Sequence, residues 1–590
     1  MIGLAILMLA AAPATGETID QAGIRLDARA ARAGTAVDAP VLVDLRLTDI
    51  ASNMPLANLH PLAWLTRMDD ARPEQECRRR IARLVDGGLL SPAQVDFNSY
   101  RLLVVNTDDS LTIVNPQVSL AGTQLEGVVA LPGVARDVAV DAPGNRAFVA
   151  LGDRVLSVDL AHGSATDFGG AIAATTLRWD GIGGRLWTAG PHGIVVLDGG
   201  SGAVLRRFDG SDAAGLELTP SRNLVAFAGG NGVVAADATG FATVAIAGVA
   251  GARALSYGDA ARRFYAIDRD GAVIALPDGA RMARTIPGVS GAERIAFEPQ
   301  GRFALVLGKQ GTHLWLVDSA ADRVVAETDL AARGLELRFS DRYGYVRSAD
   351  GMLTLLALEE LRVGQLAAVT VPLATGGPRA APSTPASDGI GLVAVPEGSG
   401  VLALSGDGGI AFYAEGMMVA MGALPTYGRQ PRSLYLLDRG LRETAPGRYR
   451  ASAALSTGGP FTLAVALDEP RIAACIPVTL PGAPPAGPPN PVTIAMIGSD
   501  AGWRAGDSRR IRIRLNGVAA LPADVRLLAM DTAGGSQQHV PLTPTGVPGA
   551  YETDLALPKA GGYRLLIESE DAGIRFGQTN AIPIVVEARP

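Results

Sequence analysis

Two cysteines and five histidines are the side chains in this 590-residue chain most able to do chemistry. Cys77 and Cys475 make an even count, and in an exported protein an even count is better explained by pairing than by two free thiols. We therefore predict a Cys77–Cys475 disulfide that joins a helix near residue 77 to a strand near residue 475. No CxxCH motif is present, so covalent attachment of a c-type haem is not expected.

A methionine cluster gives a second candidate site. Met417, Met418 and Met421 lie close together in the sequence, beside Tyr413 and Glu415. Thioethers are soft ligands that favour Cu(I), which gives one interpretation, a copper site. Methionine also fills irregular cores, and no histidine or cysteine is near in sequence to complete a metal site, so core packing is the other interpretation.

Two of the five histidines occupy equivalent places in a repeat. His192 and His313 each stand at the turn before the third strand of their repeat, on what would be one face of a ring. They are candidates for a ligand or partner face, against the alternative of solvated polar side chains in turns. No cofactor is predicted from these residues, while haem and copper both stay open.

Motifs of familiar enzyme classes are missing from the sequence. It contains no nucleophile elbow and no HExxH, and glycine-rich segments such as 229–232 fall in expected hairpin turns, not before a helix. The sequence therefore names no reaction, and whether the chain is an enzyme stays open, with a non-catalytic role favoured.

The elements that must position these residues belong to an internal repeat of about forty residues. Apolar strands ending in an acid recur at Asp159, Asp198, Asp237 and Asp318, with spacings of 39, 39 and 81 residues, the last being about two periods. A strand–turn–strand unit precedes them, as at Val138 and Ile295, and returns at Leu216, Leu255, Leu335 and Leu392. Four short strands in each period are typical of a β-propeller blade.

Counting the copies predicts eight blades, with Val95–Asp96 as the inner strand of a degraded first copy. If that stretch is not an inner strand, seven blades is the better count. The last copy is displaced by a proline-rich insertion at 376–388.

The segments outside the repeat predict an all-β flank. Strands at 41–47, 433–437, 448–455 and 461–467 predict an immunoglobulin-like sandwich split by the propeller, with one short helix at 73–85, and strands at 511–515, 525–530, 551–557 and 563–568 predict a second sandwich. The expected organisation is a signal peptide at 1–16, first sandwich part at 17–92, propeller at 93–422, remaining sandwich at 423–480, linker at 481–491 and C-terminal sandwich at 492–590.

The repeats at about 95–420 resemble the YVTN and cytochrome d1-type propeller superfamily of exported bacterial proteins. Four flanking segments are similar to an uncharacterised group of d1-like propeller proteins, whose sandwich pieces resemble the FixH and YtkA families; they are 61–64, 96–100, 413–417 and 427–432. The resemblance implies the fold and, by association, periplasmic redox or metal biology. It implies no activity, because that scaffold hosts haem enzymes, amine dehydrogenase subunits and binding proteins.

Charge and hydropathy narrow the partners. The formal charge is −7 and arginines are scattered among acids along the sequence, so no basic stripe is expected and nucleic acid is not a predicted partner. The short apolar run at 2–12 is followed by Ala-Pro-Ala, which is typical of a signal peptide, and no stretch is long enough to span a membrane. We expect a periplasmic protein, with an extracellular location as the alternative.

The function expected from all of this is an exported, non-catalytic binding or assembly module with a periplasmic protein partner. Maturation of, or electron transfer with, a redox or copper protein is the role that the resemblance suggests. Two alternatives stay open: a cofactor-containing oxidoreductase or amine-dehydrogenase-like subunit, and a surface adhesion or polysaccharide-binding protein.

Overall fold

The computed structural model describes residues 15–588, apart from the following stretches: 33–39, 58, 68–76, 79, 82–83, 85–94, 117–123, 161–162, 211–214, 220–222, 230–231, 250, 278–282, 309, 374–389, 397–399, 454, 456, 468–471, 483–491, 499–501, 518–521, 532–536, 570, 573, 575–578 and 580. The predicted signal peptide lies almost wholly outside these residues, as do most of the linker and the insertion at 376–388. The chain divides into two compact units, one of residues 1–101, 141–146 and 437–491, the other of residues 102–140, 147–436 and 492–590.

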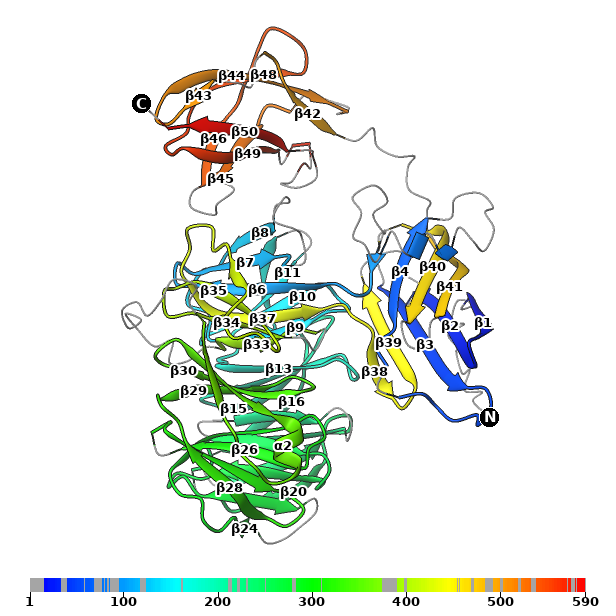
Figure 1. Ribbon diagram of the computed structural model, residues 1–590, viewed down its shortest axis with the longest axis vertical. Coiled ribbons are helices and arrows are strands. Elements are labelled where there is room, and N and C mark those ends of the chain that lie inside the picture. The colour runs from blue at the N-terminus through cyan, green and yellow to red at the C-terminus, as the bar shows by residue number, and fades with distance from the viewer. Residues whose placement is uncertain are drawn as a thin grey trace, which may run out of the picture. The chain divides into compact units, whose positions relative to one another are not determined.

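Four-stranded sheets build the middle of the chain (Figure 1). Eight of them lie between Tyr100 and Asp438 in the part of the chain that is described. Their first strands are β9 (Asp137–Asp141), β13 (Thr176–Asp180), β17 (Gly215–Thr219), β21 (Ala254–Gly258), β25 (Ala292–Phe297), β29 (Gly334–Phe339), β33 (Leu392–Ala394) and β37 (Pro431–Asp438). The all-β propeller fold is as predicted, and the count of eight blades remains our interpretation of these sheets.

The other strands follow in the same order from sheet to sheet. The second strands are β10 (Arg146–Ala150), β14 (Arg185–Gly190), β18 (Leu224–Gly229), β22 (Arg263–Ile267), β26 (Phe303–Gly308), β30 (Tyr343–Ser348), β34 (Gly400–Leu404) and β6 (Tyr100–Asn106). The third are β11 (Val155–Asp159), β15 (Gly193–Asp198), β19 (Gly232–Asp237), β23 (Val273–Pro277), β27 (His313–Asp318), β31 (Met352–Ala357), β35 (Ile410–Ala414) and β7 (Ser110–Val114). The fourth are β12 (Ser164–Phe168), β16 (Val204–Asp209), β20 (Thr243–Ala247), β24 (Arg284–Thr285), β28 (Arg323–Asp329), β32 (Val369–Pro372), β36 (Gly422–Leu424) and β8 (Leu125–Ala130).

The strand-ending acids mark the repeat as predicted. Asp159, Asp198, Asp237 and Asp318 each end the third strand of their sheet. Neighbouring sheets then bury apolar side chains against each other, as Phe148 of one sheet and Leu186 of the next do in a common core cluster. Each sheet gains a dry face only from its neighbour, which is the physical reason for the repetition.

The ring closes with a strand that the sequence analysis assigned elsewhere. β37 pairs with β6 and completes the sheet β37-β6-β7-β8, so the prediction that residues 433–437 open a sandwich is wrong. The prediction that Val95–Asp96 is an inner strand is also wrong, because this stretch is β5 and pairs with β4 (Leu62–Arg67) in a different sheet. One sheet therefore combines strands from both ends of the propeller segment. β37 takes the place that was expected for Val95–Asp96, so the loss of that inner strand does not reduce the number of four-stranded sheets from eight to seven. These sheets begin in the chain with β6 at Tyr100 and end with β37 at Asp438.

Hydrogen bonds connect the first strands of neighbouring sheets where the ring closes. The Leu177 backbone N–H of β13 donates to Asp137 of β9 at 2.9 Å, and the Tyr435 hydroxyl of β37 donates to the same carboxylate at 3.1 Å. The Leu434 N–H donates to the Ile390 carbonyl, just before β33, at 2.6 Å. First strands from both ends of the repeat are thus joined side by side.

A two-sheet sandwich forms from segments before and after the propeller. One sheet has the order β1-β2-β3-β39-β38 and the other β41-β40-β4-β5, and both contribute to one apolar core. The strands not yet given are β1 (Thr15–Gln21), β2 (Ile24–Arg32), β3 (Val41–Asp49), β38 (Arg442–Ala445), β39 (Arg448–Ala453), β40 (Gly459–Leu467) and β41 (Ile472–Leu480). β3 pairs with β39, and β4 with β40, so this core needs both parts of the chain.

A second sandwich lies within the C-terminal segment. Its sheets are β42-β44-β48-β47 and β43-β50-β49-β45-β46, which share another apolar core. The strands are β42 (Thr493–Met496), β43 (Trp503–Arg504), β44 (Ser508–Asn516), β45 (Arg526–Asp531), β46 (Gln537–Pro541), β47 (Thr543–Pro544), β48 (Ala550–Ala556), β49 (Gly561–Glu568) and β50 (Ile582–Glu587). That either sandwich is immunoglobulin-like remains a prediction.

Helix is scarce. Cys77, Arg78, Arg80, Ile81 and Leu84 are helical, within the helix predicted at 73–85. A second short helix, α2 (Leu358–Arg362), was not predicted; it buries Leu358 and Leu361, which are spaced three residues apart and therefore face the same side.

Candidate functional site: the propeller channel

The first strands enclose a pocket of about 840 Å³. Seven of the eight first strands contribute residues to the lining, and Ile390, two residues before β33, contributes for the eighth, so the pocket lies along the axis that these strands surround. Eleven charged side chains line it, five arginines and six acids: Arg136, Arg178, Arg253, Arg294, Arg338, Asp137, Glu217, Asp259, Glu293, Glu298 and Glu336. In a cleft this rich in charge, the charged groups without a partner inside the chain are the ones available to a ligand.

Asp137 is fully engaged at the closure of the ring. Its carboxylate accepts hydrogen bonds from the N–H groups of Leu177 and Val138 and from the Tyr435 hydroxyl, and it pairs with Arg178 at 3.2 Å. Burial raises the pKa of Asp137, and the Arg178 charge offsets part of that rise. Burial and the nearby Asp137 charge raise the pKa of Tyr435, which keeps its hydroxyl protonated as a donor.

Glu336 and Glu298 are also occupied by structural partners. Glu336 forms a buried ion pair with Arg347 at 2.8 Å and accepts the Gly391 N–H at 2.7 Å. Glu298 accepts the N–H groups of Gln300 and Arg302 in the turn after β25, at 2.7 and 2.8 Å. These two carboxylates hold the channel wall together and are not offered to a ligand.

Glu217 is different. Its side chain, two residues before the end of β17, makes no hydrogen bond or ion pair with any residue that the structure describes. Loss of water on burial raises its pKa to about 7, and the charges of Arg178 and Arg338 only partly oppose that rise. Glu217 therefore changes its charge near neutral pH, which an ordinary glutamate does not.

Positive charge converges on the same part of the channel. Arg338 donates to the carbonyl of Leu337, its chain neighbour, at 2.8 Å. Burial lowers the pKa of Arg338; Glu336 opposes this, while Arg294 and Arg178 lower it further by repulsion. Three guanidinium groups from β13, β25 and β29 thus act on one region, and Arg294 has no hydrogen bond or ion pair among the described residues.

The sequence analysis missed this site. Its arginines come from different repeats and look scattered in the sequence, and only the closed ring brings them together. One signal was available: Arg178, Glu217 and Arg338 each stand two residues before a buried polar residue near the end of a first strand, namely Asp180, Thr219 and Ser340. Charged residues at equivalent positions of repeats are the mark of a shared axis.

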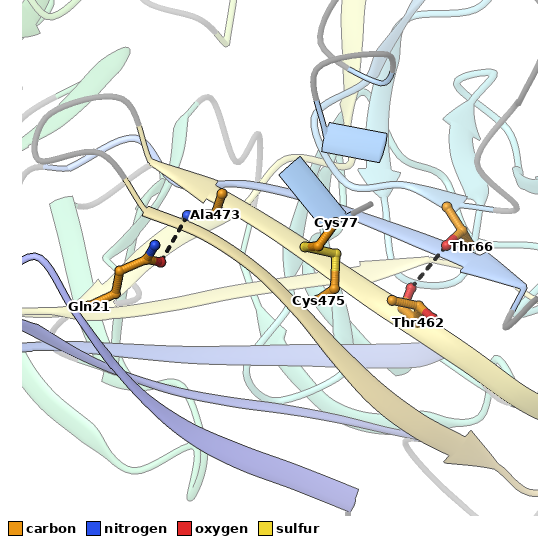
Figure 2. The surroundings of a disulfide bond; sticks show 6 residues. All are labelled: Gln21, Thr66, Cys77, Thr462, Ala473 and Cys475. Atoms are coloured by element: carbon orange, nitrogen blue, oxygen red, sulfur yellow. Dashed lines mark hydrogen bonds between the residues drawn. A yellow bond between two sulfur atoms is a disulfide. The ribbon is translucent and has the colours of Figure 1, made fainter. Parts of the chain in front are cut away.

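The predicted disulfide is present, as Figure 2 shows. Cys77 and Cys475 are bonded with their Cα atoms 5.8 Å apart, which links the helical residues near 77 to β41. The bond lies on a small apolar cluster that includes Trp64, Ile81 and Ala464, whereas the alternate residues of β4 and β40 face the main sandwich core. Nearby, the Ala473 N–H donates to Gln21 and the Thr66 hydroxyl donates to the Thr462 carbonyl (Figure 2).

The methionine cluster forms an exposed turn between β35 and β36. Met417, Met418 and Met421 are 41%, 75% and 57% exposed, so the core-packing interpretation is wrong. The Tyr413 hydroxyl donates to the Met417 carbonyl, which fixes the turn. Glu415 does not join the methionines, because it accepts from Ser340 and Tyr345. Copper binding here remains a hypothesis.

The two histidines have different surroundings. His192 is exposed in the turn between β14 and β15, as a solvated turn residue would be. His313 is not in a turn as predicted: it is the first residue of β27 and is buried. Its Nδ1 lies 2.6 Å from Asp329, its Nε2 3.2 Å from Glu327 and its ring against Trp315. Neither lines the channel pocket, and a partner role for them stays a prediction.

The described residues hold no helix long and apolar enough to cross a membrane.

Comparison with known proteins finds only distant structural similarity. No protein-family profile and no curated protein matches the chain. Similar solved structures include dihydro-heme d1 dehydrogenase NirN in complex with DHE, with 15% identity, a TM-score of 0.45 and coverage of 58% of this chain and 76% of that one. BamB from Moraxella catarrhalis (16% identity, TM-score 0.40, 60% and 98% coverage) and apo AztD from Citrobacter koseri (14%, 0.43, 57% and 98%) are others.

Proposed function

We propose that this chain is an exported, non-catalytic β-propeller binding module and that the channel pocket is its binding site. The observation that carries the proposal is the division of charge in the pocket. Asp137, Glu336 and Glu298 are saturated by structural partners, whereas Glu217 and Arg294 have none among the described residues. Charges kept in a cleft without internal partners cost folding free energy, and a ligand that pairs with them recovers it.

Export is supported by the disulfide. Both cysteines of the chain are consumed in one bond. Disulfides persist in oxidising compartments such as the periplasm and are rare in the cytosol. A periplasmic protein partner, in maturation of or electron transfer with a redox or copper protein, is the role we propose for the module.

Site-specific photo-crosslinking in the native periplasm tests the binding role. A crosslinking amino acid replaces Arg136 or Arg253, which are exposed residues of the pocket lining, and Leu205 on the outer strand β16 serves as the matched control. We expect one defined product from positions 136 and 253, absent from position 205 and weakened by Arg338→Met inside the channel. Equal products at all three positions, or none at the channel, would overturn the channel as the binding site.

An absorbance spectrum with metal analysis of the same purified material tests the non-catalytic part. We expect no visible absorbance band and no stoichiometric metal. A haem or quinone spectrum would overturn the proposal in favour of a cofactor-containing oxidoreductase.

A further inference from the structure

We propose that Arg178, Arg294 and Arg338 form an oxyanion-binding site in the channel, and that Glu217 is an internal occupant whose negative charge an incoming oxyanion replaces. The inference rests on the proposed function, because it names the ligand chemistry of the same pocket. The ligand is a small molecule or a partner side chain that presents a carboxylate, sulfate or phosphate group.

The charge around these arginines favours an anion. The pocket as a whole holds five arginines against six acids, but Asp137, Glu298 and Glu336 already accept from structural donors, whereas Arg178, Arg294 and Arg338 act on one region. Guanidinium groups bind carboxylate and phosphate through paired N–H donors, and the low-dielectric walls of a cleft strengthen that attraction. Because Arg338 is already repelled by two other arginines, an anion at this place would relieve that repulsion.

The geometry of the three arginines leaves donors available. Arg178 is tethered to Asp137 and to the Leu177 carbonyl through Nη1, and Arg338 to the Leu337 carbonyl through Nη1. The other guanidinium nitrogens of these two residues make no hydrogen bond within the described chain, and Arg294 makes none at all there. The tethers position the groups from β13 and β29, while the unused donors point to an acceptor supplied from outside.

Glu217 makes the site sensitive to pH. As a carboxylate it already supplies a negative charge near Arg178 and Arg338; as a neutral acid it leaves them unbalanced. Its pKa of about 7 places this change within the physiological range. A bound oxyanion disfavours the charged form of Glu217, so binding above pH 7 takes up a proton, and affinity increases as pH falls from 8 to 6.

The other charged groups that face this region come from every neighbouring first strand. They are Asp137 on β9, Arg178 on β13, Arg253 and Asp259 beside β21, Glu293 and Arg294 on β25, Glu336 and Arg338 on β29, and Tyr435 on β37. Burial also raises the pKa of Asp137, but the Arg178 charge and the N–H groups of Leu177 and Val138 oppose that rise. Burial and the Asp137 charge raise the pKa of Tyr435, so its hydroxyl stays neutral between pH 6 and 8. Glu217 is thus the group to which we assign the pH dependence.

The test is calorimetric titration of the full chain with sulfate and with oxalate, two dianions whose own charge is constant from pH 6 to 8. We expect both to bind, about tenfold more tightly at pH 6 than at pH 8, because a group with a pKa near 7 is mostly neutral at the first pH and mostly charged at the second. A tetraglutamate peptide in place of oxalate distinguishes a partner's acidic side chain from a free small molecule, according to which binds more tightly.

Two substitutions decide the mechanism. Glu217→Gln is expected to remove the pH dependence and to tighten binding about tenfold at pH 8, whereas Arg338→Met is expected to weaken binding at least tenfold at every pH. Glu359→Gln and Arg323→Met, both exposed and outside the pocket, are the matched controls and should behave as the unchanged chain. Arg338→Lys, with thermal unfolding as a check on folding, separates loss of the site from loss of the fold.

The experiments distinguish failure of the oxyanion site from failure of the proposed binding function. Absence of dianion binding at pH 6, or a pH dependence that survives Glu217→Gln, overturns this inference. The crosslinks at Arg136 and Arg253 would still appear if the channel binds a partner by other chemistry, so their presence or absence decides the broader proposal independently.

Discussion

Two carboxylates in the same channel have opposite surroundings. Glu336 on β29 is buried against Arg347 and also accepts the Gly391 N–H, so both of its oxygens have donors. Glu217 on β17 lines the same pocket, is partly exposed, and has neither an ion pair nor a hydrogen bond among the described residues. The charge of Glu336 is thus balanced within the chain, whereas the charge of Glu217 is not.

The contrast separates structural from functional charge. A buried ion pair contributes little net stability when intact, but removing one partner strands the other and is costly. An unpaired carboxylate has the reverse effect, because removing its charge relieves a cost that folding already bears. The two sites should therefore respond to substitution with opposite signs.

The largest effect on stability is expected at the Glu336–Arg347 ion pair. Arg347→Met leaves Glu336 buried with the Gly391 N–H as its remaining donor, and we expect the propeller to lose about 3–5 kcal/mol of stability. Urea unfolding followed by the fluorescence of the buried Trp187 and Trp315 measures it. Arg154→Met, which breaks an exposed pair with Asp153, is the control and should leave the midpoint unchanged. Equal urea midpoints for Arg347→Met and Arg154→Met would show that the buried ion pair matters no more to stability than the exposed one.

A smaller effect of opposite sign is expected at Glu217. Its pKa rises from 4.5 to about 7 on folding, so the folded chain binds the proton more tightly, and stability is lost as pH rises from about 4.5 to about 7. Glu217→Gln should abolish this loss and be more stable than the unchanged chain at pH 8, by on the order of 1–3 kcal/mol, since channel water screens part of the shift. Urea midpoints at pH 4.5, 6 and 8 measure it, and parallel curves for the two chains would contradict it.

The smallest effect is expected at the ring closure. Tyr435→Phe removes one of the donors to Asp137, and the N–H groups of Leu177 and Val138 and the Arg178 side chain remain. We expect a loss of about 1 kcal/mol, the usual value of one hydrogen bond whose partner keeps others. A loss of stability as large as that of Arg347→Met would show that Tyr435 is as important to the fold as the Glu336–Arg347 ion pair.

The repeat and its hairpins could be predicted because strand period and turn residues are local properties. The acids that end β11, β15, β19 and β27 mark each repeat without any knowledge of the neighbours. Pairing is not local: the apolar alternation at 433–437 fits a sandwich strand and a propeller strand equally well, and only the vacant edge of β6 decides between them. Val95–Asp96 was misassigned for the same reason.

The candidate site was less accessible to sequence reasoning. The disulfide followed from cysteine count and export, but the channel charges come from several repeats and acquire meaning only when the ring closes. Nothing in the residues next to Glu217 distinguishes it from a solvated glutamate; its unusual pKa comes from burial and from arginines on β13 and β29.

The Cys77–Cys475 bond has a consequence for the chain as a covalent object. It spans 398 positions, and β6 to β37 all lie between its ends. A protease that cuts one loop of the propeller would release no fragment, since the two pieces would still be tied through sulfur and through the strands that close the ring. In the compartment where the bond forms, a nicked molecule would migrate as an intact one until it is reduced.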